Sequence, residues 1–254
     1  MSNVYYAPGE ARSARVNDLF GRIARRYDLL NDLQSFGLHR HWKRRVVALA
    51  RVTPGARALD LCCGTGDLAF ALAQRGAEVT GLDFSAQMLE VAKNRSGRMK
   101  AGTREPGSQN PNFIQGDALQ LPFAENTFDI LTVGYGLRNL ASWERGLEEM
   151  RRVARPGARV IVLDFGKPAN PLWRAAFFGH LKISVPLIGL LFCGNASAYA
   201  YILESLKHYP AQVAVAEKMR ALNLTRLQVI NLVGGAMAIN YGETAASADK
   251  VPNS

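Results

Sequence analysis

A regular alternation of short apolar runs with helical segments between residues 56 and 165 restricts the fold of this chain more than any other feature. Helix-like segments lie at about 67–75, 85–95 and 142–154, the last closed by RPGAR in a Pro/Gly turn. The apolar runs have the composition of buried parallel strands: ARALDL, EVTGLD, NFIQGD, FDILTV and ARVIVLDF. This alternation predicts a doubly wound α/β sandwich whose ligands lie at the carboxyl ends of the strands.

The remainder of the chain adds two strands and several helices to this core. RLQVINLV and AMAINY follow about sixty residues later and predict an antiparallel closing pair, which gives a seven-stranded Rossmann-like sheet. Residues 183–203 contain no charged side chain or histidine, so they resemble a membrane span of about 20 residues. Pro186 and four polar or glycine positions interrupt that run, so we expect a hydrophobic helical lid or buried core instead. Segment 96–111 has no apolar period and is expected to be an exposed loop.

The charge of the chain indicates an anionic partner. The net charge is +10, and residues 1–51 hold ten Lys and Arg against four acids. Such a surface suits nucleic acid or a membrane, although a solvated helix face explains it equally well. Three cysteines, two of them adjacent, cannot form a disulfide framework, and no signal sequence opens the chain, so we expect a cytoplasmic location.

The glycine-rich loop in ALDLCCGTGDLAF formally matches a dinucleotide-binding fingerprint. GTGDLA fits G-x-G-x-x-G/A, and Asp83 ends the next strand 19 residues after Gly64. However, Asp60 precedes the loop and Asp67 opens the following helix, where a pyrophosphate needs only donors. A cationic ligand fits better, so we favour S-adenosylmethionine, with its sulfonium and ammonium groups, over NAD.

Each requirement of S-adenosylmethionine can be assigned to a residue at a strand end. Gly64 and Gly66 let the backbone approach the nucleoside, and Asp83 can accept from both ribose hydroxyls. Asp117 can accept from the adenine amino group, and Asp60 can orient the amino-acid end. A methyltransferase is therefore favoured, with an NAD-dependent oxidoreductase and an RNA methyltransferase as alternatives.

Several motifs carry a family resemblance over about residues 17–242. LDLCCGTGDLAF, GLDFS, GDALQLPF and RRVARPGARVIVLDF resemble the motifs of class I S-adenosylmethionine-dependent methyltransferases. More narrowly, the chain resembles the ubiquinone/menaquinone biosynthesis C-methyltransferase family in YDLLNDLQSFGLHRHWKR, GYGLRNL and YILESLKHYP. The resemblance implies C-methylation of a prenylated quinol ring. It places cofactor contacts at Thr65, Asp83, Asp117, Ala118 and position 134, where Gly134 replaces the serine of some members and favours demethylmenaquinol over a benzoquinol.

The implied reaction needs a phenolate, whose neighbouring ring carbon is then nucleophilic. Arg138, just past the fourth strand, is placed to stabilise that charge, while Asn139 could bind the second ring oxygen and Tyr27 could relay a proton. We expect water positioned by Arg138 to take the ring proton. The structural alternative for Arg138 is an ion pair with an acid such as Glu144.

The four histidines show no metal-ligand spacing, so no metal is predicted and surface or packing roles are favoured for His39, His41, His180 and His208. His39 and His41 remain candidate bases because they lie in a segment of family resemblance.

A quinol with an isoprenoid tail lies in the bilayer, so we expect transient contact with an anionic membrane surface, peripherally at its inner face. The basic amino-terminal segment and the apolar residues 172–203 would supply that contact. No nucleic-acid partner is expected, and a homodimer is left open.

We expect a single domain over residues 1–254. Within the amino-terminal part, Phe20, Ile23, Tyr27 and Leu30 recur at helical spacing, and Val46, Val47 and Leu49 indicate a second helix. The predicted parts are a helical cap at 12–51, a cofactor-binding core at 56–166, a helical lid or substrate region at 167–222, closing strands at 223–242 and a disordered tail at 243–254.

Overall fold

The computed structural model describes residues 27–98, 109–193 and 209–246 together with positions 21, 24, 203, 205 and 206, without the side chains of residues 188–193. The strands are β1 (Arg57–Leu61), β2 (Glu78–Asp83), β3 (Asn112–Gln115), β4 (Phe128–Gly134), β5 (Ala154–Phe165), β6 (Leu224–Leu232) and β7 (Met237–Thr244). The helices are α2 (Tyr27–Ser35), α3 (Leu38–Ala50), α4 (Asp67–Ala73), α5 (Ala86–Arg98), α6 (Trp143–Val153), α7 (Pro171–Cys193) and α9 (Ala211–Ala221), and the short 3₁₀ helices are η4 (Leu137–Asn139) and η5 (Val233–Gly235).

The seven strands form one sheet in the order β3-β2-β1-β4-β5-β7-β6. The first five strands pair in parallel, whereas β7 is antiparallel to both β5 and β6. The predicted doubly wound sheet, its antiparallel closing pair and the helices inserted before that pair are thus confirmed. The strand order reverses between β1 and β4, which is where ligands bind in open α/β sheets.

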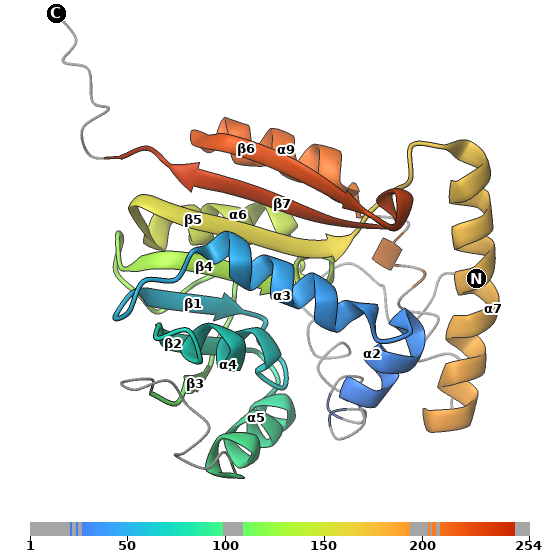
Figure 1. The fold of residues 1–254 in the computed structure, drawn as a ribbon, viewed down its shortest axis with the longest axis horizontal. Helices are drawn as coiled ribbons and strands as arrows, with labels where there is room; N and C mark the ends of the chain where they lie inside the picture. The colour runs from blue at the N-terminus through green and yellow to red at the C-terminus, as the bar shows by residue number, and fades with distance from the viewer. Residues whose placement is uncertain are drawn as a thin grey trace, which may run out of the picture.

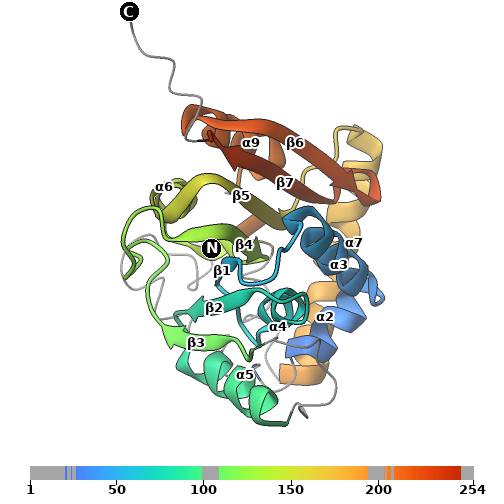
Figure 2. The ribbon, with the colours of Figure 1, turned by 60° about the vertical axis from the view of Figure 1, so that its left-hand side comes forward.

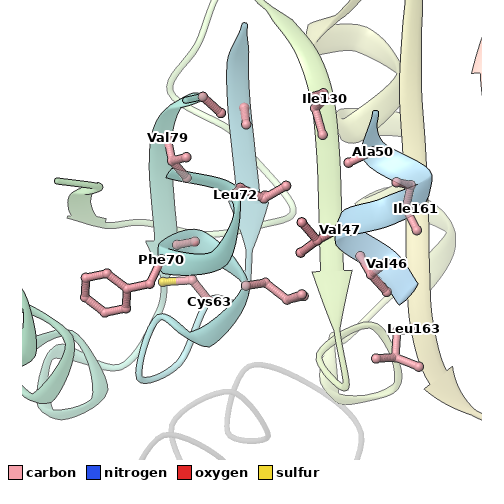
Figure 3. Close-up of a cluster of buried hydrophobic side chains, with 14 of the residues drawn as sticks. Val46, Val47, Ala50, Cys63, Phe70, Leu72, Val79, Ile130, Ile161 and Leu163 are labelled. Atoms are coloured by element: carbon pink, nitrogen blue, oxygen red, sulfur yellow. The ribbon is translucent and has the colours of Figure 1, made fainter. Parts of the chain in front are cut away.

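Helices cover both faces of the sheet, and two more lie beyond the ends of its strands. α3 and α4 lie on one face and α6 and α9 on the other, while α2 and α7 stand beyond the carboxyl ends of the parallel strands (Figure 1, Figure 2). Val46 and Val47 of α3 are buried against the side of the sheet that carries Ile130 and Ile161 (Figure 3). Burying each such side chain contributes roughly 1.5–3 kcal/mol. The predicted second helix therefore packs on the core, although Leu49 is only half-buried.

The predicted Pro/Gly turn before β5 is wrong. β5 begins at Ala154, directly after α6, and the RPGAR segment lies inside the strand. Ala154 pairs with Phe128, but the next pair joins Arg159 to Ile130, so the pairing is irregular there. The residue before a proline disfavours helical dihedral angles, and this restriction before Pro156 explains why α6 ends here. Gly157 has φ +78, which lets the chain bend without leaving the sheet.

The apolar run near residue 186 belongs to α7, which begins at Pro171, inside the region 167–222 predicted to be helical, and contains Pro186. No helix among the described residues is both long and apolar enough to cross a membrane. α5 continues to Arg98, so the predicted loop begins later than expected. Several predictions fall outside the described residues: Phe20, Ile23, His208, and the segments 99–108, 194–202 and 247–254.

Candidate active site

A cavity of about 110 Å³ lies at the carboxyl ends of β1, β2 and β4. Its lining includes these predicted site residues: Tyr27, Gly64, Asp83, Asp117, Ala118, Gly134 and Asn139. Asp60 and Thr65 line a smaller adjoining pocket that shares Gly64 and Gly134 with it. The structure therefore brings most of the predicted cofactor residues together from separate loops, and we call this space the cofactor cavity.

Two glycines shape the loop after β1 in different ways. Gly64 has φ +55, and among the described residues a Cβ there would meet one atom within 4 Å, a Tyr27 ring carbon at 3.9 Å. Gly66 has φ +88, and a Cβ there would lie 2.8 Å from Phe113 and 2.9 Å from Phe70. Gly64 thus keeps the cavity wall open. Gly66 is needed for the turn and its packing rather than for lining the cavity.

Asp83 ties the end of β2 to the glycine loop. Its Oδ2 accepts from the Gly64 amide at 2.8 Å, and its Oδ1 accepts from the Ser85 amide at 2.9 Å. Burial raises the pKa of Asp83, against the effect of these amides. Each carboxylate oxygen retains a lone pair that can accept from a ligand hydroxyl.

Asp60 and Asp67 differ sharply in charge environment. Asp60 is 1% exposed and accepts from Thr132 Oγ1 at 2.7 Å, and burial raises its pKa to about 7. Asp67 binds Lys43 Nζ at 2.6 Å and also Arg95. Burial opposes its ionisation, but these two cations outweigh burial and lower the pKa of Asp67 to about 2. The negative charge of Asp67 is therefore already balanced by Lys43 and Arg95, which leaves Asp60 and Asp83 to attract a cationic ligand.

The other predicted cofactor contacts differ in their burial and in whether their side chains already form hydrogen bonds. Thr65 is buried, and its Oγ1 donates to Asp28 Oδ1 on α2 at 2.8 Å. Its hydroxyl therefore holds α2 against the glycine loop. Asp117 is exposed and accepts from the Leu119 amide at 2.8 Å, while Ala118 beside it is buried.

A second cavity, of about 250 Å³, lies beside the first and is enclosed by α2, α3, α7, η5 and the ends of β5 and β7. Its lining is mainly apolar and includes Trp42, Phe165, Trp173, Phe177 and Leu181. Tyr27 and Tyr135 line both cavities. We call this space the apolar cavity. Sequence reasoning missed Tyr135, although it lies within the GYGLRNL motif.

Arg138 lines the apolar cavity, whereas Asn139 lines the cofactor cavity. The Arg138 side chain is buried, with its guanidinium 3.4 Å from Asp164 Oδ1 and 4.9 Å from the Phe165 ring centroid. The Arg138 amide also donates to Asp164 Oδ2 at 3.1 Å. The structural alternative, an ion pair between Arg138 and an acid, is therefore present in the structure, but its partner is Asp164 and not Glu144, which accepts from Ser142 Oγ at the start of α6.

Tyr27 lies between the two cavities as a neutral phenol. Burial raises the pKa of Tyr27 to about 12, although Arg138 lowers it. Near neutral pH its hydroxyl can therefore donate a hydrogen bond but cannot act as a base. Of the proton relay predicted for Tyr27, only the role of hydrogen-bond donor therefore remains. Asn139 Nδ2 donates to the Tyr135 carbonyl at 3.2 Å.

The adjacent cysteines are free thiols beside the loop. Burial, followed by Asp83 and Asp60, raises the pKa of both Cys62 and Cys63 well above the usual value. Neither thiol is therefore a ready nucleophile. Among the histidines, His41 and His180 are exposed, whereas His39 is buried in hydrogen-bond contact with Asp32.

The seven-stranded sheet, with a glycine loop and carboxylates at its switch point, defines a Rossmann-like S-adenosylmethionine-dependent methyltransferase. The chain belongs to the ubiE/COQ5 methyltransferase family, which it matches over residues 9–244. The predicted enzyme class and cofactor are thereby confirmed.

Similar proteins agree with this assignment. The chain is 40% identical over 237 residues to a demethylmenaquinone methyltransferase of Desulfitobacterium hafniense (strain Y51), covering 92% of this chain and 91% of that one. It is 34% identical over 239 residues to the demethylmenaquinone methyltransferase of Staphylococcus aureus (strain JH9), covering 93% and 95%. A solved SAM-dependent methyltransferase from Aquifex aeolicus shares the fold, with 16% identity, a TM-score of 0.55, and coverage of 80% and 89%.

Proposed function

We propose that the protein methylates a ring carbon of a prenylated quinol, with demethylmenaquinol as its substrate. The observation that carries this proposal is the pair of adjoining cavities, one bordered by carboxylates and the other apolar, which share Tyr27 and Tyr135. A methyl donor in the first and a prenylated ring in the second would meet at these tyrosines. The names of the relatives from Desulfitobacterium and Staphylococcus support the choice of substrate.

The residues of the cofactor cavity fit S-adenosylmethionine. Asp83 would accept from the ribose hydroxyls and Asp117, with Ala118, would face the adenine. Asp60 in the adjoining pocket would pair with the ammonium group. Gly134 would offer the cofactor only backbone groups, and a Cβ there would lie 2.9 Å from Leu68 Cδ1. When bound, S-adenosylmethionine supplies an electrophilic methyl group.

Arg138 would activate the ring. A phenol has a pKa near 10, and a cation beside it lowers that value. The Arg138 side chain is buried at the wall of the apolar cavity, where its charge acts in a low dielectric. Asn139 would bind a ring oxygen from the side of the cofactor, and Tyr27 would donate a hydrogen bond between the two cavities.

The rim of the apolar cavity supports contact with a membrane surface. Phe36 is 83% exposed and Leu172 is 81% exposed, although both are large and apolar. They belong to a set of exposed apolar side chains on α2, the turn after it, α3, α7 and η5: Leu29, Leu33, Phe36, Leu38, Leu172, Trp173, Ile183, Leu187 and Val233. With the positive charge of residues 1–51, this rim would bind an anionic inner leaflet peripherally and receive the isoprenoid tail.

Membrane contact is tested by co-sedimentation with anionic and neutral vesicles. We expect binding to anionic vesicles that weakens with salt, and a loss of binding in Phe36→Ser/Leu172→Ser. Equal sedimentation of this variant would contradict the proposed contact. A homodimer remains a separate proposal, which analytical ultracentrifugation with and without vesicles would test.

The activity is tested with purified protein, methyl-labelled S-adenosylmethionine and lipid micelles that contain reduced demethylmenaquinone or the corresponding prenylated benzoquinol. We expect label in the lipid extract of the demethylmenaquinol reaction. Faster labelling of the benzoquinol would show that the substrate is of the ubiquinone type and not demethylmenaquinol. Label recovered only in added RNA would replace the proposal with RNA methylation.

A further inference from the structure

The apolar cavity holds buried polar atoms that the proposed function leaves unused. His39 on α3 lines this cavity and is only 3% exposed. Its Nδ1 has no hydrogen-bond partner within the part of the chain that the structure describes, and the same holds for Gln34 Nε2 and the Tyr135 hydroxyl. Buried polar atoms are nearly always paired in folded proteins. These three residues line the apolar cavity together with Asn31, whose Nδ2 also has no partner among the described residues, and a mainly apolar ligand that carries polar oxygens would suit them.

The other ring nitrogen of His39 fixes which proton it carries. His39 Nε2 lies 2.8 Å from Asp32 Oδ1, and Arg40 Nε donates to the same oxygen at 2.9 Å. Hydrogen bonds from Arg40 and His39 lower the pKa of Asp32, so its carboxylate is ionised and can only accept. Nε2 therefore carries the hydrogen, which leaves the lone pair on Nδ1, the unpartnered nitrogen. A carboxylate that orients one nitrogen while the other is free to accept is the arrangement of a histidine general base.

We propose that His39 is the base of the methyl transfer: its Nδ1 takes the proton of a ring hydroxyl, and Asp32 orients and stabilises the resulting imidazolium. This inference rests on the proposed function. The hydroxyl O–H bond breaks, its electron pair stays on the ring oxygen, and Arg138 stabilises that charge. The ring carbon then takes the methyl group, while the electrons of the broken carbon–sulfur bond stay on sulfur.

The cycle closes with His39 neutral again. The methylated carbon loses its hydrogen as a proton to water, and the electron pair of that C–H bond restores the aromatic ring. The ring oxygen then takes its proton back from His39 Nδ1. The net change releases one proton to solvent, as the loss of the positive sulfonium requires.

The position of His39 agrees with this role. Lys43 follows it by one turn of α3, and Lys43 Nζ lies 5.8 Å from the centroid of the Tyr135 ring, which borders both cavities. The charged and titratable groups around His39 come from several elements: Asp32 on α2, Lys43 on α3, Asp67 on α4, and Tyr27, Tyr135, Arg138 and His180 in the wall of the same cavity. Burial lowers the pKa of His39, against the effect of Asp32, so the imidazole is neutral at neutral pH.

The test compares His39→Gln with His41→Gln, an exposed position on the same helix. We expect His39→Gln to lower kcat on the order of 100-fold or more, the usual contribution of a general base, and His41→Gln to leave it unchanged. Binding of S-adenosylmethionine by calorimetry should be unchanged in both variants. Binding of oxidised demethylmenaquinone, which has no hydroxyl proton to give, should change less than about threefold if the role is proton transfer.

The pH profile separates a base from a structural residue. In the wild type, kcat/KM should rise with pH as His39 becomes neutral, and this limb should disappear in His39→Gln. The defect of the variant should also shrink toward pH 10, where the substrate phenol ionises unaided. Asp32→Asn should move the wild-type limb to lower pH because the carboxylate no longer stabilises the imidazolium.

Two results would overturn the inference: an unchanged limb in both variants, or a parallel loss of quinone binding and kcat in His39→Gln. If His39→Gln does not fold, the pH profile of kcat/KM in Asp32→Asn tests the role of His39 instead. A profile that does not move to lower pH in Asp32→Asn would contradict that role. Wild-type protein that methylates no quinol would instead overturn the proposed function. Active wild-type protein with a fully active His39→Gln would overturn only the role of His39.

Discussion

Thr65 on the glycine loop donates a hydrogen bond from Oγ1 to Asp28 Oδ1 on α2, 2.8 Å away. This bond ties the helix that covers both cavities to the loop that borders the cofactor. Thr65→Val keeps the shape of the side chain but removes the donor, and a hydrogen bond of this kind contributes about 0.5–1.5 kcal/mol. We expect faster amide exchange over residues 27–35 and a KM for the quinol raised about 3- to 10-fold, with a smaller change in kcat.

Thr127→Val is the matched control for this change. Thr127 Oγ1 donates to the Ala124 carbonyl within a loop that lines neither cavity. It should leave exchange in α2 and the KM unchanged. If Thr65→Val also leaves the exchange of α2 unchanged, the hydrogen bond does not hold the helix in place.

Asp60 should make cofactor binding depend on pH. Its pKa is about 7, so the carboxylate is largely protonated at pH 6 and ionised at pH 8. Because an ammonium group prefers the ionised form, the Kd for S-adenosylmethionine should fall several-fold, about 3- to 10-fold, between these two pH values. In Asp60→Asn the Kd should be higher and nearly independent of pH. Calorimetric titration of both proteins at pH 6, 7 and 8 measures this, and equal slopes would show that another group is responsible.

The same carboxylate should lower the stability of the unliganded protein. An aspartate in the unfolded chain ionises near 4, whereas folded Asp60 holds its proton up to about 7. The folded state therefore binds more protons over this interval, and its stability falls as pH rises through it. Asp60→Asn removes this loss, so its Tm relative to the wild type should be higher at pH 8 than at pH 5. Thermal unfolding at the two pH values tests the sign, and a difference that does not grow with pH would contradict it.

Arg138 should be required for turnover and not for cofactor binding. Arg138→Gln removes the cation from the apolar cavity, and losing one such preorganised group costs on the order of 100-fold or more in kcat. It also leaves Asp164 buried without its cation, which destabilises a protein by about 3–5 kcal/mol. The double variant Arg138→Gln/Asp164→Asn should recover much of the stability but not the turnover. Recovery of both would reduce Arg138 to a structural role.

Local patterns in the sequence predicted the sheet and the cofactor cavity. Apolar runs fix the strands, and in a parallel sheet the residues after the strands meet at one edge, so Gly64, Asp83 and Asp117 could be placed together without coordinates. The turn predicted for the RPGAR segment was wrong because Pro and Gly also occur at bends within strands. Nothing local separates such a bend from a turn between a helix and a strand.

Contacts between distant segments were not predictable in this way. Asp164 meets Arg138 because β4 and β5 pair with Gly134 opposite Leu163, a register that the sequence does not encode locally. The apolar cavity is formed by faces of α2, α3 and α7 that have the same composition as faces packed on a core. His39 resembled a packing histidine for the same reason, since its partner Asp32 lies on another helix.

Cys62 and Gly136 should show strong energetic coupling. Cys62 has φ +51, a strained value for a residue with a side chain, in a loop where glycine would be relaxed. Gly136 has ordinary dihedral angles, but a Cβ there would lie 2.9 Å from Cys62 Sγ and collide with Cys62 Cβ. Gly136→Ala should therefore destabilise the protein by about 1–3 kcal/mol, as overpacking does.

The double-mutant cycle follows from this contact. Cys62→Gly removes both the strained side chain and the obstacle, so Gly136→Ala should cost about 0.5–3 kcal/mol less in the Cys62→Gly background. Gly97→Ala on α5 is the control, because a Cβ there would meet none of the described residues within 4 Å. It should stabilise by about 0.5–1 kcal/mol and add independently to Cys62→Gly. Urea unfolding of the single and double variants gives the coupling, and an equal cost of Gly136→Ala in both backgrounds would mean that Cys62 is not what excludes a side chain at position 136.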